Sequence, residues 1–255
     1  VFFLVVAAIL LVAFVVWEQR TSNPLLPLRI VLDRNRGGSY LMFLLVGAGL
    51  FAMFLFLTYY FQFNLGYSPL RAGFAFLPFS GGIILAAGLV SHLLPKLGPR
   101  PLMIPGLVLS IVGMLLLLRI GQHTPYATYV LPSQLLMSVG LAGVFIPTAS
   151  TALVGVGHHD AGVASAVLNS SQQVGASLGT ALLNTVFASV VTAYLAANVH
   201  APAQLRRQTP LALIHGYHVA FLWGAGLLTG ALVCAVVIVN ARKEDVPTEA
   251  GAIPA

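Results

Sequence analysis

The stretch Asp160–Asn184, which reads DAGVASAVLNSSQQVGASLGTALLN, decides how the rest of the chain is interpreted. It is long enough to cross a bilayer, and no residue after Asp160 is charged. At helical spacing its small and polar residues share one broad face, while the larger apolar residues lie mostly elsewhere. That face comprises Gly162, Ser165, Ala166, Asn169, Gln172, Gln173, Ala176, Gly179 and Thr180. Because lipid cannot satisfy amide side chains, the face must turn toward other helices or toward water.

The composition places this stretch in an integral membrane protein. Only 7% of the 255 residues are charged and 58% are hydrophobic, whereas a soluble domain carries about 25% charged residues. The mean hydropathy is +0.95. The apolar runs are about 20 residues long and do not alternate, which indicates helices rather than a barrel. The net charge of +6 lies mainly in loops, so it indicates membrane topology and not a nucleic-acid partner.

An all-α fold with seven transmembrane helices is predicted. The segments are 1–17, 39–62, 72–94, 102–120, 128–154, 162–195 and 217–239. Since Val1 lies in the middle of an apolar run, we expect the first segment to be the end of a helix that starts upstream. The other six form two sets of three, and an odd number per set inverts the second relative to the first, as in many secondary transporters. The predicted division is a linker helix with a cytoplasmic loop (1–38), a six-helix bundle (39–240) and a disordered cytoplasmic tail (241–255).

Basic residues between the predicted helices indicate the orientation. Eight lie on one side, namely Arg20, Arg29, Arg34, Arg36, Lys96, Arg100, Arg242 and Lys243, and four on the other, namely Arg71, Arg119, Arg206 and Arg207. The larger group is expected to be cytoplasmic, which puts the N-terminus outside and the C-terminus inside. The excess of Arg over Lys is typical of a GC-rich bacterial genome, so a bacterial plasma membrane is predicted.

Helix starts are also visible in the sequence. Ser68 followed by Pro69 is an N-cap followed by a first-turn proline, and Asp160 is placed to cap the sixth helix. Pro99 and Pro101 flank the start of the fourth. Three further prolines are expected inside helices, where they would introduce kinks: Pro78, Pro105 and Pro147.

Four stretches together carry a family resemblance. They are Pro24-Leu25-Leu26-Pro27-Leu28 continuing to Arg34-Asn35-Arg36; Tyr60-Phe61-Gln62 followed by Gly66-Tyr67-Ser68-Pro69-Leu70-Arg71-Ala72-Gly73 and Leu77-Pro78; Gly140, Gly143 and Pro147; and Gly162-Val163-Ala164-Ser165 with Asn169, Gln172-Gln173 and Gly175. In order and spacing they resemble the C-terminal half of a major facilitator superfamily transporter, in the fourteen-helix multidrug:proton antiporter branch. The segment around Lys96, Gly98 and Arg100 is similar to a degenerate copy of that superfamily's cytoplasmic loop motif, without its usual acidic residue. Plain topogenic charge explains this segment equally well.

The resemblance implies proton-driven export of amphipathic or cationic drug-like molecules by alternating access, with no cofactor. Proton coupling needs a group that titrates within the membrane. The acidic residues lie at helix ends, in loops or in the tail: Glu18, Asp33, Asp160, Glu244, Asp245 and Glu249. We therefore expect the coupling carboxylates in an N-terminal half that would be the partner of this chain.

Aromatic, methionine and neutral polar residues are the candidates for a substrate pathway, because they offer apolar area and cation–π contact. They are Met53, Phe56, Tyr59, Tyr60, Gln62, Gln134, Ser138, Asn169, Gln172, Gln173 and Thr180. The tyrosines could instead form an interfacial belt, Met53 and Phe56 could be packing residues, and the amides could join helices. Residues predicted to pack helices are Gly140, Gly143, Pro147, Gly175 and Gly179, of which the last two form a GxxxG pair.

Other functions remain open at this level. A seven-helix receptor or sensor fits the helix count, although Lys96 and Lys243 both lie in loops, where no retinal could be attached. The substrate could also be an endogenous metabolite. A membrane enzyme has little support, because no Ser/His/Asp set or paired carboxylates lie within the apolar segments. The pair His158-His159 has no Cys or second ligand cluster nearby, so no metal site is predicted.

Overall fold

The computed structural model describes residues 2–21, 28–157, 159–241 and 244, and all regular secondary structure in them is helical. The helices are α1 Phe2–Arg20, α2 Leu28–Val31, α3 Arg34–Tyr59, α4 Pro69–Phe74, α5 Leu77–Leu97, α6 Arg100–Leu116, α7 Tyr126–Ala152, α8 Ala161–Asn198 and α9 Pro202–Val237. A π-helix, Tyr60–Asn64, continues α3, and a 3₁₀ helix, Leu117–Arg119, continues α6. The predicted all-α fold is confirmed for these residues.

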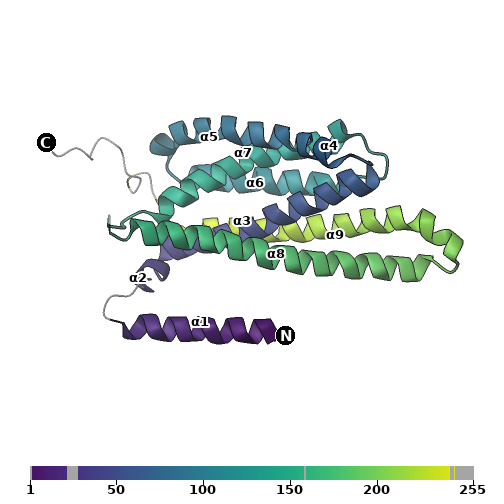
Figure 1. Cartoon of the computed structure of the whole chain (residues 1–255). Coiled ribbons are helices and arrows are strands. Elements are labelled where there is room, and N and C mark those ends of the chain that lie inside the picture. Colours follow the sequence, from purple (N-terminus) through teal and green to yellow (C-terminus); the bar gives the residue numbers. More distant parts are fainter. Residues whose placement is uncertain (1, 22–27, 158, 242–243, 245–255) are drawn as a thin grey trace.

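Six helical segments are long and apolar enough to cross a membrane. They are Arg34–Asn64, Pro69–Leu97, Arg100–Arg119, Tyr126–Ala152, Ala161–Asn198 and Pro202–Val237. These six correspond to the second to seventh predicted helices. The first predicted segment falls on α1, which Figure 1 shows beside the bundle, and the predicted tail lies outside the described residues apart from 241 and 244.

The long helices run side by side along one direction, with their chain directions alternating (Figure 1). Helix α3 packs mainly against α8 and α9, and α7 packs mainly against α5 and α6. The two three-helix sets are α3, α5 and α6, and α7, α8 and α9. The first helix of each set therefore contacts the second and third helices of the other set. A two-fold relation between the sets produces this exchange, so the packing agrees with two inverted repeats.

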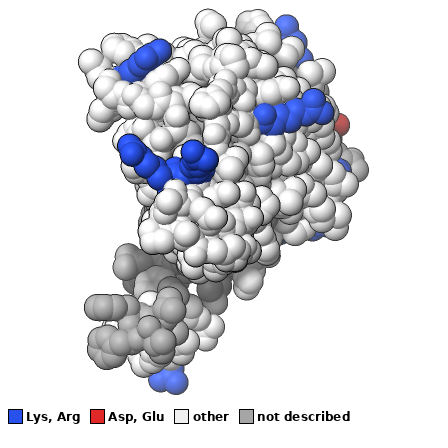
Figure 2. Space-filling model, turned by 90° about the vertical axis from the view of Figure 1, so that its right-hand side faces the viewer, with Lys and Arg blue, Asp and Glu red and all other residues white. Residues whose placement is uncertain are grey.

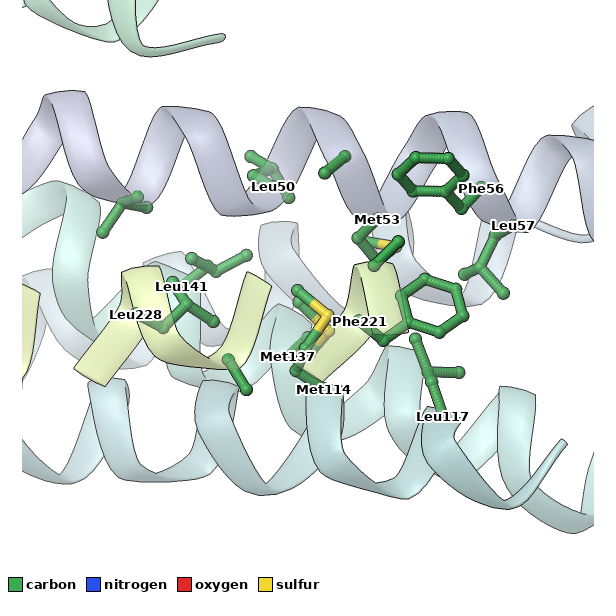
Figure 3. Close-up of a cluster of buried hydrophobic side chains, with 14 of the residues drawn as sticks. Leu50, Met53, Phe56, Leu57, Met114, Leu117, Met137, Leu141, Phe221 and Leu228 are labelled. Carbon is green, nitrogen blue, oxygen red and sulfur yellow. The ribbon is translucent and has the colours of Figure 1, made fainter. Parts of the chain in front are cut away.

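Large apolar side chains fill the space where α3, α6, α7 and α9 meet. Figure 3 shows Met53 and Phe56 of α3 facing Met114 of α6, Met137 of α7 and Phe221 of α9. All five are fully buried. Methionine adapts to irregular gaps between helices, and this set holds the first and third helices of both repeats together.

The cap predicted at Ser68 is confirmed, a further cap at Asp33 was not predicted, and two predictions about single residues are wrong. Asp33 accepts hydrogen bonds from the backbone N–H groups of the first turn of α3, and Ser68 accepts one from the N–H of Arg71. Pro78 lies in the first turn of α5, where it needs no N–H donor, and not inside the helix. The Asp160 carboxylate caps no N–H of α8 and instead binds Arg29 of α2, with Nη2 and Oδ2 2.8 Å apart.

Helices α8 and α9 are longer than a membrane requires. With 38 residues, α8 is about 57 Å long, against a hydrocarbon core of about 30 Å. The sequence predicted that the last helix starts at residue 217. Figure 1 instead shows α8 and α9 extending past the other helices at their shared turn. The prediction missed the beginning of α9 because Gln204–Thr209 is polar, and hydropathy does not detect a helix that continues beyond the bilayer.

Arginines hold the C-terminal end of α9. Arg34 at the start of α3 donates to the carbonyls of Val237 and Ile238, and Arg100 at the start of α6 donates to the carbonyl of Val236. The distances are 2.7 to 2.9 Å. These carbonyls have no partner within the helix, and cations are favourable at this end of the helix dipole. The segment Lys96–Arg100, with Gly98 at φ 83°, therefore joins three helices rather than two, while Lys96 itself is exposed.

Candidate substrate groove

Helix α8 has three faces along its middle turns. One is buried against the bundle and contains Leu168, Gly175 and Gly179. A second is exposed and apolar, with Val174, Leu178 and Leu182 between 48% and 57% accessible. The third is polar and open, and it is formed by Gln173, Ser177, Thr180 and Asn184. The helix therefore has one face that contacts the bundle, one that suits lipid and one that needs water or a polar partner.

The buried face of α8 approaches α3 at backbone distance. A Cβ atom on Gly175 would collide with the backbone carbonyl of Leu44, and one on Gly179 would collide with Ala48. On the opposite helix, a Cβ on Gly47 would lie 2.6 Å from the carbonyl oxygen of Gln172. Small residues on both helices permit this contact, as in other membrane helix pairs.

Glycines also permit a close backbone contact between α6 and α7. A Cβ on Gly140 would meet the backbone of Gly106 and Ser110, and one on Gly143 would lie 3.1 Å from the carbonyl oxygen of Leu102. Pro147 is buried farther along α7, and the hydroxyl of Thr151 donates to its carbonyl at 2.8 Å. These glycines bring the last helix of one repeat against the first helix of the other.

A groove of about 490 Å³ opens between the polar face of α8 and α3. Its lining consists of Phe51, Leu55 and Tyr59 from α3 and of Gln173, Ala176, Ser177, Thr180, Ala181 and Asn184 from α8. The volume lies within the range of about 300–1,000 Å³ typical of small-molecule sites. One wall is thus apolar and aromatic, and the other carries neutral hydrogen-bonding groups.

The α3 wall is a stripe with a four-residue spacing, so the side chains of Phe51, Leu55 and Tyr59 lie above one another. Phe51 is 43% exposed and Tyr59 is half-buried. The ring of Tyr59 contacts those of Phe63 and Phe187, with centroids 5.6 and 6.5 Å apart. These contacts hold the tyrosine ring at one end of the groove, and Phe187 ties it to α8.

No charged residue lines the groove. Among the described residues, the carboxylates are Glu18 in the last turn of α1, Asp33 and Asp160 before α3 and α8, and Glu244 after α9. A hydrogen bond from His159 and the nearby Arg29 guanidinium lower the pKa of Asp160 below its usual value, so this carboxylate is charged at neutral pH. Figure 2 shows the end of the bundle farthest from it as a mostly uncharged surface with a few separate basic groups.

The predicted pathway residues divide into three groups in the structure. Tyr59, Gln173 and Thr180 line the groove. Three others lie outside its lining with part of their surface accessible: Gln62 and Gln172 are half-buried, and Asn169 is exposed. Five are fully buried within the bundle: Met53, Phe56, Tyr60, Gln134 and Ser138.

The buried group cannot face a second half-bundle, because any residue that faced one would be exposed in this chain. Met53 and Phe56 belong to the core in Figure 3, and the hydroxyl of Tyr60 donates to the carbonyl of Gly121 at 2.9 Å. Ser138 donates to the carbonyl of Leu135 at 2.9 Å. We therefore assign these five residues to helix packing and leave them out of the candidate site.

Several groove residues were not predicted from the sequence. Phe51 and Leu55 could have been found from their four-residue spacing to Tyr59. Ser177 and Asn184 lie one turn from Gln173 and Thr180 and continue the same polar face. The signal was present, but only the structure shows that these positions face each other across an open space.

Comparison with known proteins identifies the family. The sequence model of the Major Facilitator Superfamily matches residues 1–180. The chain belongs to the major facilitator superfamily. It is therefore part of a membrane transporter and not an enzyme, and the groove belongs to a transporter half-bundle.

Several bacterial members of this family are similar to the chain. It is 44% identical over 244 residues to the puromycin resistance protein pur8 of Streptomyces alboniger, with 94% of the chain and 48% of that protein covered. It is 31% identical to the uncharacterized MFS-type transporter EfpA of Mycobacterium tuberculosis, covering 87% and 42%, and 35% identical to the cephamycin export protein CmcT of Amycolatopsis lactamdurans, covering 70% and 37%. The chain spans about half the length, or less, of the curated relatives it matches.

Proposed function

We propose that this chain is the C-terminal half of a proton-coupled efflux transporter that exports amphipathic drug-like molecules by alternating access. The groove between α3 and α8 is the observation that carries the proposal. It has the volume of a drug-sized site, and its two walls match an apolar body and polar substituents. The resistance and export proteins among the relatives support the same class of substrate.

In this proposal the driving group lies in the other half of the transporter. The described carboxylates of this chain are at helix ends, where they cannot carry a proton through the membrane. The basic residues Arg34, Arg36, Lys96 and Arg100 lie at one end of the bundle, which supports a cytoplasmic location for that end. The C-terminus is then cytoplasmic, in a bacterial plasma membrane.

Expression of the complete gene in an efflux-deficient bacterium tests this function. Cellular accumulation of puromycin, chloramphenicol and tetraphenylphosphonium would be measured with and without a protonophore. Lower accumulation of at least one compound, restored by the protonophore, is expected. The 255-residue chain expressed alone should export none of them.

Two results would contradict the proposal. Export by the chain alone would mean that the driving group lies within it. Export by the complete protein that persists after the proton gradient has collapsed would mean another energy source.

A second candidate is export of a metabolite made by the producing cell. The similarity to a cephamycin export protein favours it, since that name describes export of a natural product. Deletion of the gene, followed by comparison of secreted small molecules, separates the two. A missing secreted compound, with unchanged sensitivity to added drugs, would favour the metabolite.

A further inference from the structure

The polar side chains of α8 differ in whether their hydrogen-bonding groups are used. Five of them donate to carbonyls of their own helix: Asn169, Ser171, Thr185, Ser189 and Asn198. The four that line the groove, Gln173, Ser177, Thr180 and Asn184, make no side-chain hydrogen bond to any described residue, and neither do Ser165, Ser170, Gln172 and Thr192 outside it. A row of free donors and acceptors thus faces the groove.

The row runs along the helix axis. Gln173 and Asn184 are eleven positions apart, which corresponds to roughly 16 Å at a rise of about 1.5 Å per residue. The amides and hydroxyls in it can both donate and accept. Opposite this row, Phe51 and Tyr59 present rings and Leu55 an aliphatic side chain. The arrangement suits an elongated molecule with an aromatic part on one edge and several hydrogen-bonding groups on the other.

The absence of charge among the lining residues decides between two kinds of substrate. A molecule with a permanent positive charge would find no carboxylate in this wall and would have only cation–π contact. Removing such a charge from water is costly unless it is paired. An uncharged molecule with hydroxyl or amide groups would satisfy the free row on α8 and lose no charge solvation.

We propose that the α3–α8 groove recognises uncharged aromatic molecules that carry hydroxyl or amide groups, in preference to permanent cations, through Gln173, Ser177, Thr180 and Asn184. This inference rests on the proposed function and narrows its substrate class. Gln173 and Thr180 were candidates from the sequence, whereas the free row as a recognition element comes from the structure.

The chain offers a matched pair of threonines for the test. Thr180 lines the groove with a free hydroxyl, whereas the hydroxyl of Thr185 donates to the carbonyl of Ala181 at 2.8 Å. Thr→Val changes the same atoms in each case. In the complete transporter, export of chloramphenicol, which is uncharged and aromatic with hydroxyl and amide groups, should fall roughly 5-fold in Thr180→Val for one lost hydrogen bond. It should stay at the wild-type level in Thr185→Val.

Tetraphenylphosphonium, an aromatic cation without hydrogen-bonding groups, is the second probe. Thr180→Val should leave its export unchanged, and Asn184→Asp should raise it, because the new carboxylate pairs with the cation. Immunoblots of membrane fractions would correct each rate for the amount of protein.

The inference is overturned if the two valine variants behave alike, if Thr180→Val lowers export of both probes equally, or if the wild type prefers tetraphenylphosphonium. Export of tetraphenylphosphonium alone would overturn this inference while leaving the proposed function intact, whereas export of no probe would remove both.

Discussion

Two faces of α8, roughly 150° apart around the helix axis at about 100° per residue, have different roles. The face with Gly175 and Gly179 has no side chain at those two positions and contacts the α3 backbone there. The face with Gln173 and Asn184 has amides without partners among the described residues and touches no neighbouring helix closely enough to be buried. The first stabilises the half-bundle, and the second leaves hydrogen-bonding capacity available for another molecule.

The difference between these faces shows how one membrane helix can combine structure and recognition. Close packing between membrane helices requires small residues, because lipid provides no hydrophobic drive for association. Unused amides cost free energy in lipid, so they persist only where water, a ligand or another protein segment meets them. Substitutions on the two faces should therefore have opposite signatures, with stability affected on one and transport on the other.

The largest effect is expected on the packing face. Gly175→Leu would place a side chain where the backbone of Leu44 lies, and the helices would have to separate. Overpacking costs about 1–3 kcal/mol even where side chains can move, and a backbone cannot move aside as they do. The full-length variant should fail to accumulate in the membrane, as measured by immunoblot. Gly162→Ala is the control, because a Cβ there meets nothing within 4 Å. Wild-type levels of Gly175→Leu would contradict the close α3–α8 contact.

A smaller effect, on transport alone, is expected on the groove face. Asn184 is exposed, so Asn184→Leu should change the free energy of unfolding by less than about 0.5 kcal/mol. Export of an uncharged probe should nevertheless fall. Thermal unfolding of the detergent-purified protein and an accumulation assay would be run on the same preparation of the variant. A clear loss of thermal stability would contradict this prediction and would mean that Asn184 is a packing residue.

The smallest effect is expected at the start of α8, where Asp160 binds Arg29. Because the pKa of Asp160 is lowered in the folded protein, its carboxylate contributes to stability above the unfolded pKa, and this contribution is lost as the pH falls through the folded value. With an unfolded pKa near 3.9, the contribution of the ion pair to stability should be complete at neutral pH and should begin to fall below about pH 4. Asp160→Asn should therefore lower the thermal stability slightly at pH 7 and by less at pH 3. An equal difference at both values would mean that the pair does not stabilise α8.

Much of the architecture could be predicted from the sequence, for reasons visible in particular residues. The apolar runs located the six membrane segments, and Ser68 with Pro69 marked the start of α4. The Gly175/Gly179 spacing predicted a close helix contact but not the identity of α3 as the partner. The beginning of α9 was missed, since it lies beyond the part of the helix that hydropathy can detect.

The candidate site was only partly predictable. Met53 and Phe56 have the chemistry of pathway residues, yet they fill the centre of the bundle. Gln172 and Gln173 are neighbours of the same type, but one is half-buried beside Gly47 and the other lines the groove. Sequence spacing shows which residues share a face of a helix. It does not show which face packs against the neighbouring helix.

The sequence alone determined that the chain is a set of membrane helices in two inverted triplets and that α8 cannot face lipid on all sides. Length, hydropathy and the cost of burying amides are enough for those conclusions, because they depend on local chemistry. Only the tertiary structure decided which polar groups of α8 are used by its own backbone, which glycines contact α3 and where a groove stays open. Those properties arise from contacts between helices far apart in sequence, and the pairing of α3 with α8 is set by the packing of the whole bundle.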